Sequence, residues 1–133
     1  MKVIIHSDGG ARGNPGPAGI GAILQAENGE ILASVSQYLG VATNNQAEYK
    51  ALIAALEKAQ LLGAQELDCF LDSELIVKQI NREYKVKNKD LAPLFLQVNN
   101  LLSKFKKYRF NHIAREYNKE ADRLANEAMD GAQ

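Results

Sequence analysis

The chain has 133 residues, of which 46% are hydrophobic and 24% are charged, so we expect one globular domain over residues 1–133. Its 16 basic and 16 acidic side chains give a formal net charge of zero, which argues against binding of nucleic acid through overall charge. No apolar run approaches the roughly 18 residues that a membrane span needs. No signal-peptide pattern opens the chain, so we expect a cytoplasmic protein without a membrane partner.

The N-terminal half of the sequence predicts three strands and a long helix. β-branched residues such as Val3 and Ile4 suit a buried strand, which ends at Asp8 and runs into a glycine- and proline-rich turn. Asn28-Gly29 is a strong hairpin signal between the next two strands, so the three strands form an antiparallel meander. The predicted elements of this half are strands at residues 2–8, 18–26 and 30–38, a turn at 9–17, a loop at 39–42 and a helix at 44–62.

The C-terminal half alternates between strands and helices. The strand that follows the long helix is parallel to the first strand, since the two are joined by a β-α-β crossover. The predicted elements are a strand at residues 66–71, a helix at 73–80, a basic loop at 81–89, a helix at 91–105, a strand at 108–114 and a helix that Asn118 caps and that reaches Met129. The order βββαβααβα predicts an α/β fold with a mixed five-stranded sheet, three antiparallel strands plus parallel strands, flanked by helices.

Four carboxylates stand at the ends of predicted elements: Asp8, Glu48, Asp72 and Asp122. Asp8 and Asp72 follow neighbouring parallel strands, so both lie at the carboxyl edge of the sheet, where open α/β sheets build their sites. Glu48 and Asp122 lie in the first turns of two helices. Hard oxygen ligands without a His or Cys cluster suit magnesium or manganese. Two such ions about 4 Å apart would clamp a phosphodiester, so we predict a metal site.

Each carboxylate also has a structural interpretation. Glu48 is placed to form a capping box with Asn45, and Asp72 is placed to cap the helix that follows it. Asp122 suits the first turn of a helix, where the dipole favours an acid, and Asp8 suits a turn. These alternatives stay open for each residue taken alone, whereas the convergence of all four favours the metal site.

Four blocks of sequence carry a resemblance that covers essentially the whole chain. They are Asp8-Gly-Gly-Ala-Arg-Gly-Asn-Pro-Gly-Pro-Ala-Gly-Ile-Gly21, Thr43-Asn-Asn-Gln-Ala-Glu-Tyr-Lys-Ala-Leu52, Asp72-Ser-Glu-Leu-Ile-Val-Lys-Gln79 and Arg115-Glu-Tyr-Asn-Lys-Glu-Ala-Asp-Arg-Leu-Ala125. In this order they resemble the four acidic motifs of type 1 ribonuclease H, in the short form that lacks a basic protrusion. The resemblance implies a ribonuclease H-like fold and a metal-dependent endoribonuclease. Such an enzyme hydrolyses the RNA strand of RNA–DNA hybrids to 3′-hydroxyl and 5′-phosphate ends, with two Mg²⁺ (or Mn²⁺) ions per site when substrate is bound.

The resemblance also implies roles for single residues. The catalytic and metal-binding acids are Asp8, Glu48, Asp72 and Asp122, and Arg115 takes the catalytic place of a loop histidine, while His112 is expected in the preceding strand as a structural residue. An arginine there serves as a phosphate contact or charge partner, since its pKa is too high for a general base. The expected substrate-binding residues are Gly9, Gly10, Ala11, Arg12, Asn14, Thr43, Asn44, Asn45, Gln46, Ser73 and Glu74. Thr43 and Gln46 also fit a capping box, and the effect of Glu74, where many relatives have glutamine, is open.

The chain departs from larger relatives in the segment at residues 81–89. Those relatives insert a basic helix with tryptophans, whereas this chain has no tryptophan and only four basic residues there: Arg82, Lys85, Lys87 and Lys89. We therefore expect weaker substrate binding with a shallow salt dependence, because fewer phosphates are neutralised. Double-stranded RNA as a further substrate, and a non-catalytic hybrid-binding module, stay open as alternatives, and we expect a monomer.

Overall fold

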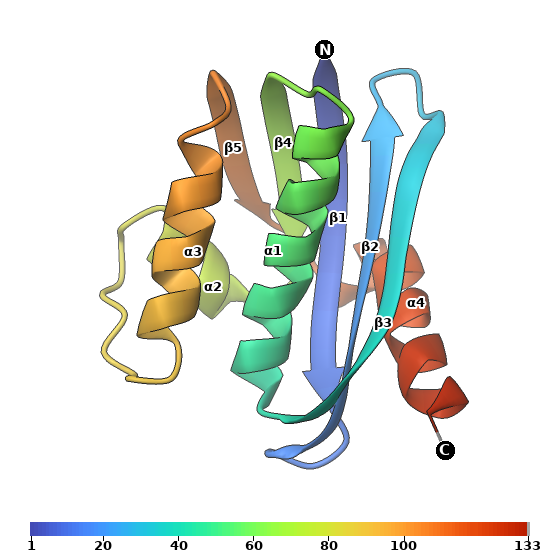
Figure 1. The fold of residues 1–133 in the computed structure, drawn as a ribbon, viewed down its shortest axis with the longest axis vertical. Helices are drawn as coiled ribbons and strands as arrows, with labels where there is room; N and C mark the ends of the chain where they lie inside the picture. The colour runs from blue at the N-terminus through green and yellow to red at the C-terminus, as the bar shows by residue number, and fades with distance from the viewer. Residues whose placement is uncertain (133) are drawn as a thin grey trace.

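The computed structural model describes residues 1–132, which form one five-stranded sheet with helices on both faces (Figure 1). The elements are β1 (Lys2–Ala11), β2 (Gly16–Ala26), β3 (Ile31–Ala42), α1 (Asn44–Leu61), β4 (Glu66–Leu71), α2 (Glu74–Ile80), α3 (Ala92–Leu102), β5 (Lys107–His112), a 3₁₀ turn η1 (Arg115–Tyr117) and α4 (Lys119–Gly131). The strand order is β3-β2-β1-β4-β5. β1 pairs antiparallel with β2 and parallel with β4, so the predicted element order and mixed sheet are confirmed.

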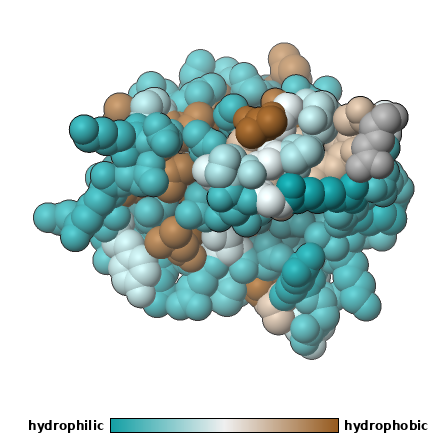
Figure 2. Space-filling view, turned by 90° about the horizontal axis from the view of Figure 1, so that it is seen from below, coloured by the Kyte–Doolittle hydropathy of each residue, from teal (hydrophilic) through white to brown (hydrophobic). Residues whose placement is uncertain are grey.

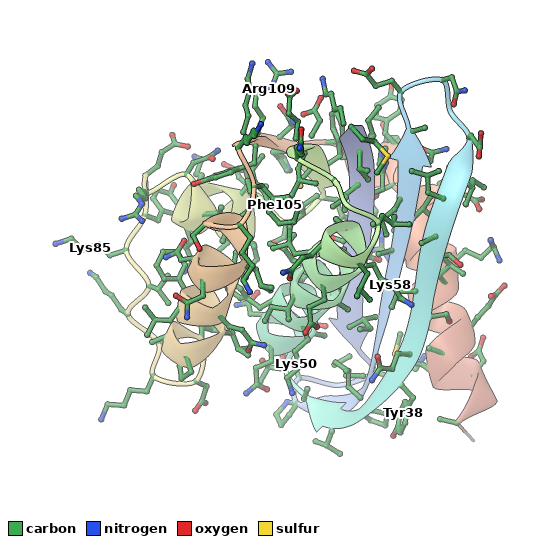
Figure 3. All side chains as sticks on the ribbon, turned by 45° about the horizontal axis from the view of Figure 1, so that its top comes forward. Tyr38, Lys50, Lys58, Lys85, Phe105 and Arg109 are labelled. Atoms are coloured by element: carbon green, nitrogen blue, oxygen red, sulfur yellow. The ribbon has the colours of Figure 1, made fainter. Side chains whose placement is uncertain are left out.

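Several predicted boundaries were wrong. Residues 39–42, predicted as a loop, continue β3, because β2 begins early enough for Gly16 to pair with Ala42. The helix predicted to reach residue 105 ends at Leu102, and Phe105 folds into the core from the turn that follows (Figure 3). The last strand is Lys107–His112 instead of residues 108–114, and the sequence did not predict the 3₁₀ turn at Arg115–Tyr117.

The helices form two layers around the sheet. α1 and α3 pack together on one face, and α4 packs against β2, β3 and β1 on the other (Figure 1). The main core lies under α1, where Leu52 and Leu56 are fully buried with Ile5 and Leu71 of the sheet. Among residues 1–132, no helix combines the length and the apolar character needed to cross a membrane.

Two glycines let the helices approach the strands closely. A side chain at Gly9, near the end of β1, would collide with the main-chain oxygen of Ala47 in α1. A side chain at Gly21 of β2 would collide with the main-chain oxygen of Ala121 in α4. Only a residue without a Cβ fits at such distances. These contacts bring the first turn of each helix to the end of β1.

Candidate active site

The strand pairing brings the first two carboxylates together. Ser7 of β1 lies opposite Leu71 of β4, the last pair between these parallel strands, so the next residues, Asp8 and Asp72, lie side by side where that pairing ends. β1 continues past Asp8, which pairs with Gly21 of β2. Glu48 projects from the first turns of α1, which Gly9 allows close to β1. These three acids come from β1, α1 and the end of β4, as the sequence predicted.

Their oxygen atoms form a compact cluster. One carboxylate oxygen from each of Asp8, Glu48 and Asp72 lies within 4.8 Å of the other two. Asp8 and Glu48 are each only 8% exposed, and Glu48 Oε2 is buried without a hydrogen-bond partner among the described residues. Hard oxygen donors with an unsatisfied buried lone pair fit a divalent cation such as Mg²⁺.

Asp122 approaches this cluster from the other side of the sheet. It lies in the first turn of α4 and lines the same cleft as the other three acids. A side-chain hydrogen bond between Asp122 and Asp8 contributes to the raised pKa of Asp8. The structure thus brings all four predicted acids to one cleft, with three of them in the tightest group.

The cluster disfavours its own ionisation. Burial raises the pKa of Asp8 well above its usual range, and the carboxylates of Glu48 and Asp72 raise it further. Burial also raises the pKa of Glu48, although hydrogen bonds from Asp8 and from the main chain of Gly9 oppose that effect. Both shifts follow from like charges gathered in a poorly solvated place. A bound cation would reverse this balance and favour the ionised carboxylates.

Arg115 lies at the rim of the cleft. Its Nη2 atom is 3.5 Å from Asp122 Oδ1, and the arginine side chain is 78% exposed, so it can reach a molecule in the cleft. His112 belongs to β5, as predicted, and is its last residue, but its side chain is exposed and does not line the cleft. Of His112 and Arg115, only Arg115 therefore lies beside the carboxylates.

The glycine-rich turn and the start of α1 form one wall of the cleft. The predicted substrate-binding residues that line it are Gly9, Gly10, Ala11, Arg12, Asn44, Asn45 and Ser73. The main-chain N–H of Ala11 donates to Asn44 Oδ1 at 2.8 Å, and that of Asn44 donates to Asn14 Oδ1 at 3.0 Å. The two asparagines therefore fix the turn against the helix.

The other predicted contact residues lie outside this cleft. Thr43 and Gln46 form the capping box of α1, with Gln46 N donating to Thr43 Oγ1 at 3.1 Å and Thr43 N donating to Gln46 Oε1 at 2.8 Å. Asn14 and Thr43 line a smaller neighbouring pocket together with Asn45. Glu74 does not line the cleft either, and its carboxylate pairs with Lys78 at 3.0 Å.

Sequence reasoning missed the contribution of α4. Ala125, Asn126 and Met129 line the cleft, and their spacing of three, four and seven residues from Asp122 is the helical signal that identifies them. Asn118 was expected to cap α4, but its side chain makes no such bond. It is buried and donates instead to the main-chain oxygen of Ser7 at 2.9 Å.

The surface around the cleft is polar. Figure 2 views the molecule from below, toward the end where β1 finishes and α1 begins, and hydrophilic residues dominate this face with only isolated hydrophobic ones. Lys85, in the basic loop between α2 and α3, points away from the body of the protein (Figure 3). Arg109 lies at the opposite end of the sheet (Figure 3).

Comparisons with known proteins agree on one family. A family model described as "Reverse transcriptase-like" matches residues 6–128. "Bifunctional protein Rv2228c" of Mycobacterium tuberculosis is 49% identical over 133 residues, covering 99% of this chain and 36% of that protein. This chain thus spans about a third of the length of that relative. "Ribonuclease HI" of Halobacterium salinarum is 42% identical over 131 residues, covering 98% of this chain and 66% of that protein.

A solved structure extends the likeness to three dimensions. The crystal structure of LC11-RNase H1 in complex with an RNA/DNA hybrid superposes with a TM-score of 0.93 at 47% identity. The match covers 98% of this chain and 98% of that one. The fold described above is therefore shared with a protein whose structure was solved with an RNA/DNA hybrid bound.

Proposed function

The chain belongs to the type 1 ribonuclease H family, and from this membership we propose that it is a metal-dependent endoribonuclease that hydrolyses the RNA strand of RNA–DNA hybrids. The observation that carries the proposal is the cluster of Asp8, Glu48 and Asp72, with oxygens within 4.8 Å of one another at the edge of the sheet. A module that only binds hybrids gains nothing from three clustered acids, two of them buried, beside a phosphate chain, because they repel it. The hybrid-bound relative supports the substrate class.

The acids are proposed to hold divalent metal, with Asp8, Glu48, Asp72 and Asp122 as ligands. Two bound Mg²⁺ or Mn²⁺ ions would activate the attacking water and stabilise the leaving oxygen, which yields 3′-hydroxyl and 5′-phosphate ends. The protein itself orients the carboxylate oxygens. The pairing of β1 with β4 positions Asp8 and Asp72, and the close packing of α1 against Gly9 positions Glu48. Arg115 is proposed to contact a phosphate and stabilise negative charge at the reacting group.

The glycine-rich turn is proposed to recognise the minor groove of the hybrid. The 2′-hydroxyl, which distinguishes RNA from DNA, lies in that wide and shallow groove. A side chain at Gly10 would meet only Asn44 Oδ1, at 3.9 Å, so the main chain there is open toward the cleft. Asn14 and Asn44 accept main-chain bonds with their oxygens, and their amide nitrogens are the groups proposed to read base edges and 2′-hydroxyls.

The N-terminus of α1 is proposed to hold the sugar-phosphate chain. Thr43 and Asn45 line the small pocket beside the cleft, where main-chain N–H groups and the helix dipole favour an anion. Gln46 and Ser73 are proposed to contribute as cap residues that fix the two helix starts. A cytoplasmic, monomeric protein stays our prediction from the sequence.

The experiment that tests this proposal is cleavage of labelled duplexes with Mg²⁺ or Mn²⁺. RNA–DNA hybrid, double-stranded RNA and double-stranded DNA are compared, using the wild-type chain, Asp72→Asn and Glu57→Gln, an exposed acid of α1. We expect metal-dependent cutting of the RNA strand in the hybrid, lost in Asp72→Asn and kept in Glu57→Gln. Binding without cutting identifies the non-catalytic module, and cutting of double-stranded RNA widens the substrate range.

A further inference from the structure

Among the described residues, both cations that line the cleft are already paired with carboxylates. Arg115 Nη2 lies 3.5 Å from Asp122 Oδ1, and Arg12 Nη2 lies 2.7 Å from Asp130 Oδ1. Asp122 has a proposed role at the metal site. Asp130 has none, because it lies two turns farther along α4 and does not line the cleft. The shorter of the two ion pairs therefore has no explanation in the proposed chemistry.

The position of Asp130 is not explained by the stability of its helix. It lies in the last turn of α4, where the helix dipole disfavours a negative charge, and this turn contains no basic residue. Arg12 reaches it from the glycine-rich turn across the cleft, and the same Nη2 atom is 3.4 Å from Asn126 Oδ1. Asp130 thus pairs with Arg12, a cation that is distant in the sequence and that lines the substrate cleft.

The Arg12–Asp130 ion pair is accessible enough for another anion to replace the carboxylate. The side chain of Arg12 is 39% exposed and that of Asp130 is 66% exposed, and ion pairs at such accessible positions contribute little to folding stability. A guanidinium group binds carboxylate and phosphate oxygens through the same N–H groups. A phosphate of an incoming nucleic acid strand can therefore replace the Asp130 carboxylate on Arg12.

We propose that Asp130 acts as an internal competitor for Arg12 and sets the affinity of the cleft for its nucleic-acid substrate. This inference rests on the proposed function. Substrate must displace Asp130 before Arg12 meets a phosphate, so the residue weakens binding without taking part in the reaction. Its effect falls on KM and on the dissociation constant, whereas kcat is unaffected because the reacting groups lie at Asp8, Glu48 and Asp72.

The test measures hybrid binding by fluorescence anisotropy in chains that also carry Asp72→Asn, so that nothing is cut. We expect Asp130→Asn to tighten hybrid binding about two- to five-fold, the range that an exposed ion pair represents. Glu127→Gln is the matched control, because it removes the same charge one turn away, where Glu127 pairs with Arg123 at 2.6 Å. This control leaves the affinity at the level of the parent chain.

A double-mutant cycle with Arg12→Gln makes the test specific. Arg12→Gln weakens binding, and in its background Asp130→Asn has no further effect, because no guanidinium is left to release. Unchanged or weaker binding by Asp130→Asn overturns the inference, as does tightening that persists with Arg12→Gln or that Glu127→Gln reproduces. If the wild-type chain neither binds nor cuts hybrid, the proposed function itself fails. If the wild-type chain cuts hybrid and Asp130→Asn leaves the affinity of the Asp72→Asn chain unaltered, only this inference fails.

Discussion

Asp8 is a carboxylate whose charged form the fold disfavours. Burial is the first cause of its raised pKa, and the charges of Glu48 and Asp72 are the next. The folded chain therefore keeps a proton in this cluster at a pH where the unfolded chain has released it. The same arrangement suits a cation, which removes the repulsion and leaves the oxygens in place as ligands.

The first prediction concerns the stability of the metal-free protein. Because the folded pKa of Asp8 lies above its unfolded value, its favourable contribution is complete below about pH 4 and is lost as pH rises toward the folded pKa. Metal-free Asp8→Asn has no such loss, so we expect it to exceed the wild type at pH 7–8 by about 1–3 kcal/mol. Urea unfolding in chelator from pH 5 to pH 9 measures this difference.

Magnesium reverses that order. Added metal stabilises the wild type, because it binds the folded state, and has a smaller effect on Asp8→Asn. Glu57→Gln, an exposed acid of the same charge, should follow the wild type at every pH. A metal-free Asp8→Asn that is less stable than the wild type at pH 8 contradicts the electrostatic interpretation of the cluster.

Asn118 links the segments that carry Asp8 and Asp122 through two hydrogen bonds. Its amide donates to the main-chain oxygen of Ser7, the residue before Asp8, while its own main-chain oxygen accepts from Asp122 N at 3.1 Å. We expect Asn118→Ala to lose about 1–3 kcal/mol of stability, because a buried acceptor is left unpaired. Thermal unfolding measures the loss, with exposed Asn100→Ala as the control. Equal stability of the two variants rules out this role.

At the scale of elements, the close packing of α4 against β2 positions Asp122. The main chain of the helix lies against Gly21, and it also lies close to Gly19 two residues earlier. No side chain separates the helix from the strand at these positions, so direct contact between the two main chains determines how close α4 lies to the sheet. The opposite helix, α1, meets β1 at Gly9 in the same way.

A methyl group at Gly21 should therefore lift α4 from the sheet. We expect Gly21→Ala to cost at least about 1–3 kcal/mol of folding stability, as overpacking of a close contact does. Because Asp122 moves with the helix, Mg²⁺ affinity falls as well. Gly131→Ala, on the same helix with no atom within 4 Å of the added methyl, is the matched control. Urea unfolding and Mg²⁺ titration measure both effects, and wild-type values for Gly21→Ala would show that the helix has room to adjust.

At the scale of the whole molecule, the features that could be predicted from the sequence are those that short stretches of residues determine. The β-branched residues of the first strand, the Asn28-Gly29 hairpin and the β-α-β crossover helped to predict the element order, and the crossover placed Asp8 beside Asp72. The extension of β3 through residues 39–42 depends on a partner strand, which local pattern does not reveal. The Arg12–Asp130 pair joins residues too distant in the sequence for any spacing rule to associate.

Charge distribution across the whole molecule leads to a further prediction. Lys85, Lys87 and Lys89 lie in the loop between α2 and α3, whereas Lys104, Lys106 and Lys107 lie where β5 begins, at the end of the sheet away from the cleft (Figures 1 and 3). Replacing the first three lysines by glutamine should weaken hybrid binding and reduce the salt slope by about 0.7–0.9 for each phosphate that is no longer neutralised.

Replacing the second three lysines is the matched control, since it removes the same charge. Binding isotherms at several salt concentrations give both slopes. Equal losses of affinity in the two triple variants would mean that general charge, and not the position of the loop, governs binding. A wild-type slope as steep as that of a strongly basic nucleic-acid binder would contradict the expectation that few phosphates are neutralised.

The close seat of α1 on Gly9 has a consequence for how this protein tolerates sequence change. Gly9 carries no reactive group, yet any side chain there collides with the main chain of Ala47, whereas a Cβ at neighbouring Gly10 would make only an ordinary contact with Asn44 Oδ1, at 3.9 Å. In a selection of all substitutions for activity, Gly9 should accept as few residues as Asp8, for reasons of volume, whereas alanine at Gly10 should leave the folding stability unchanged. A position at this site can thus be intolerant to substitution because two main chains pass close together there, and not only because its side chain takes part in the chemistry.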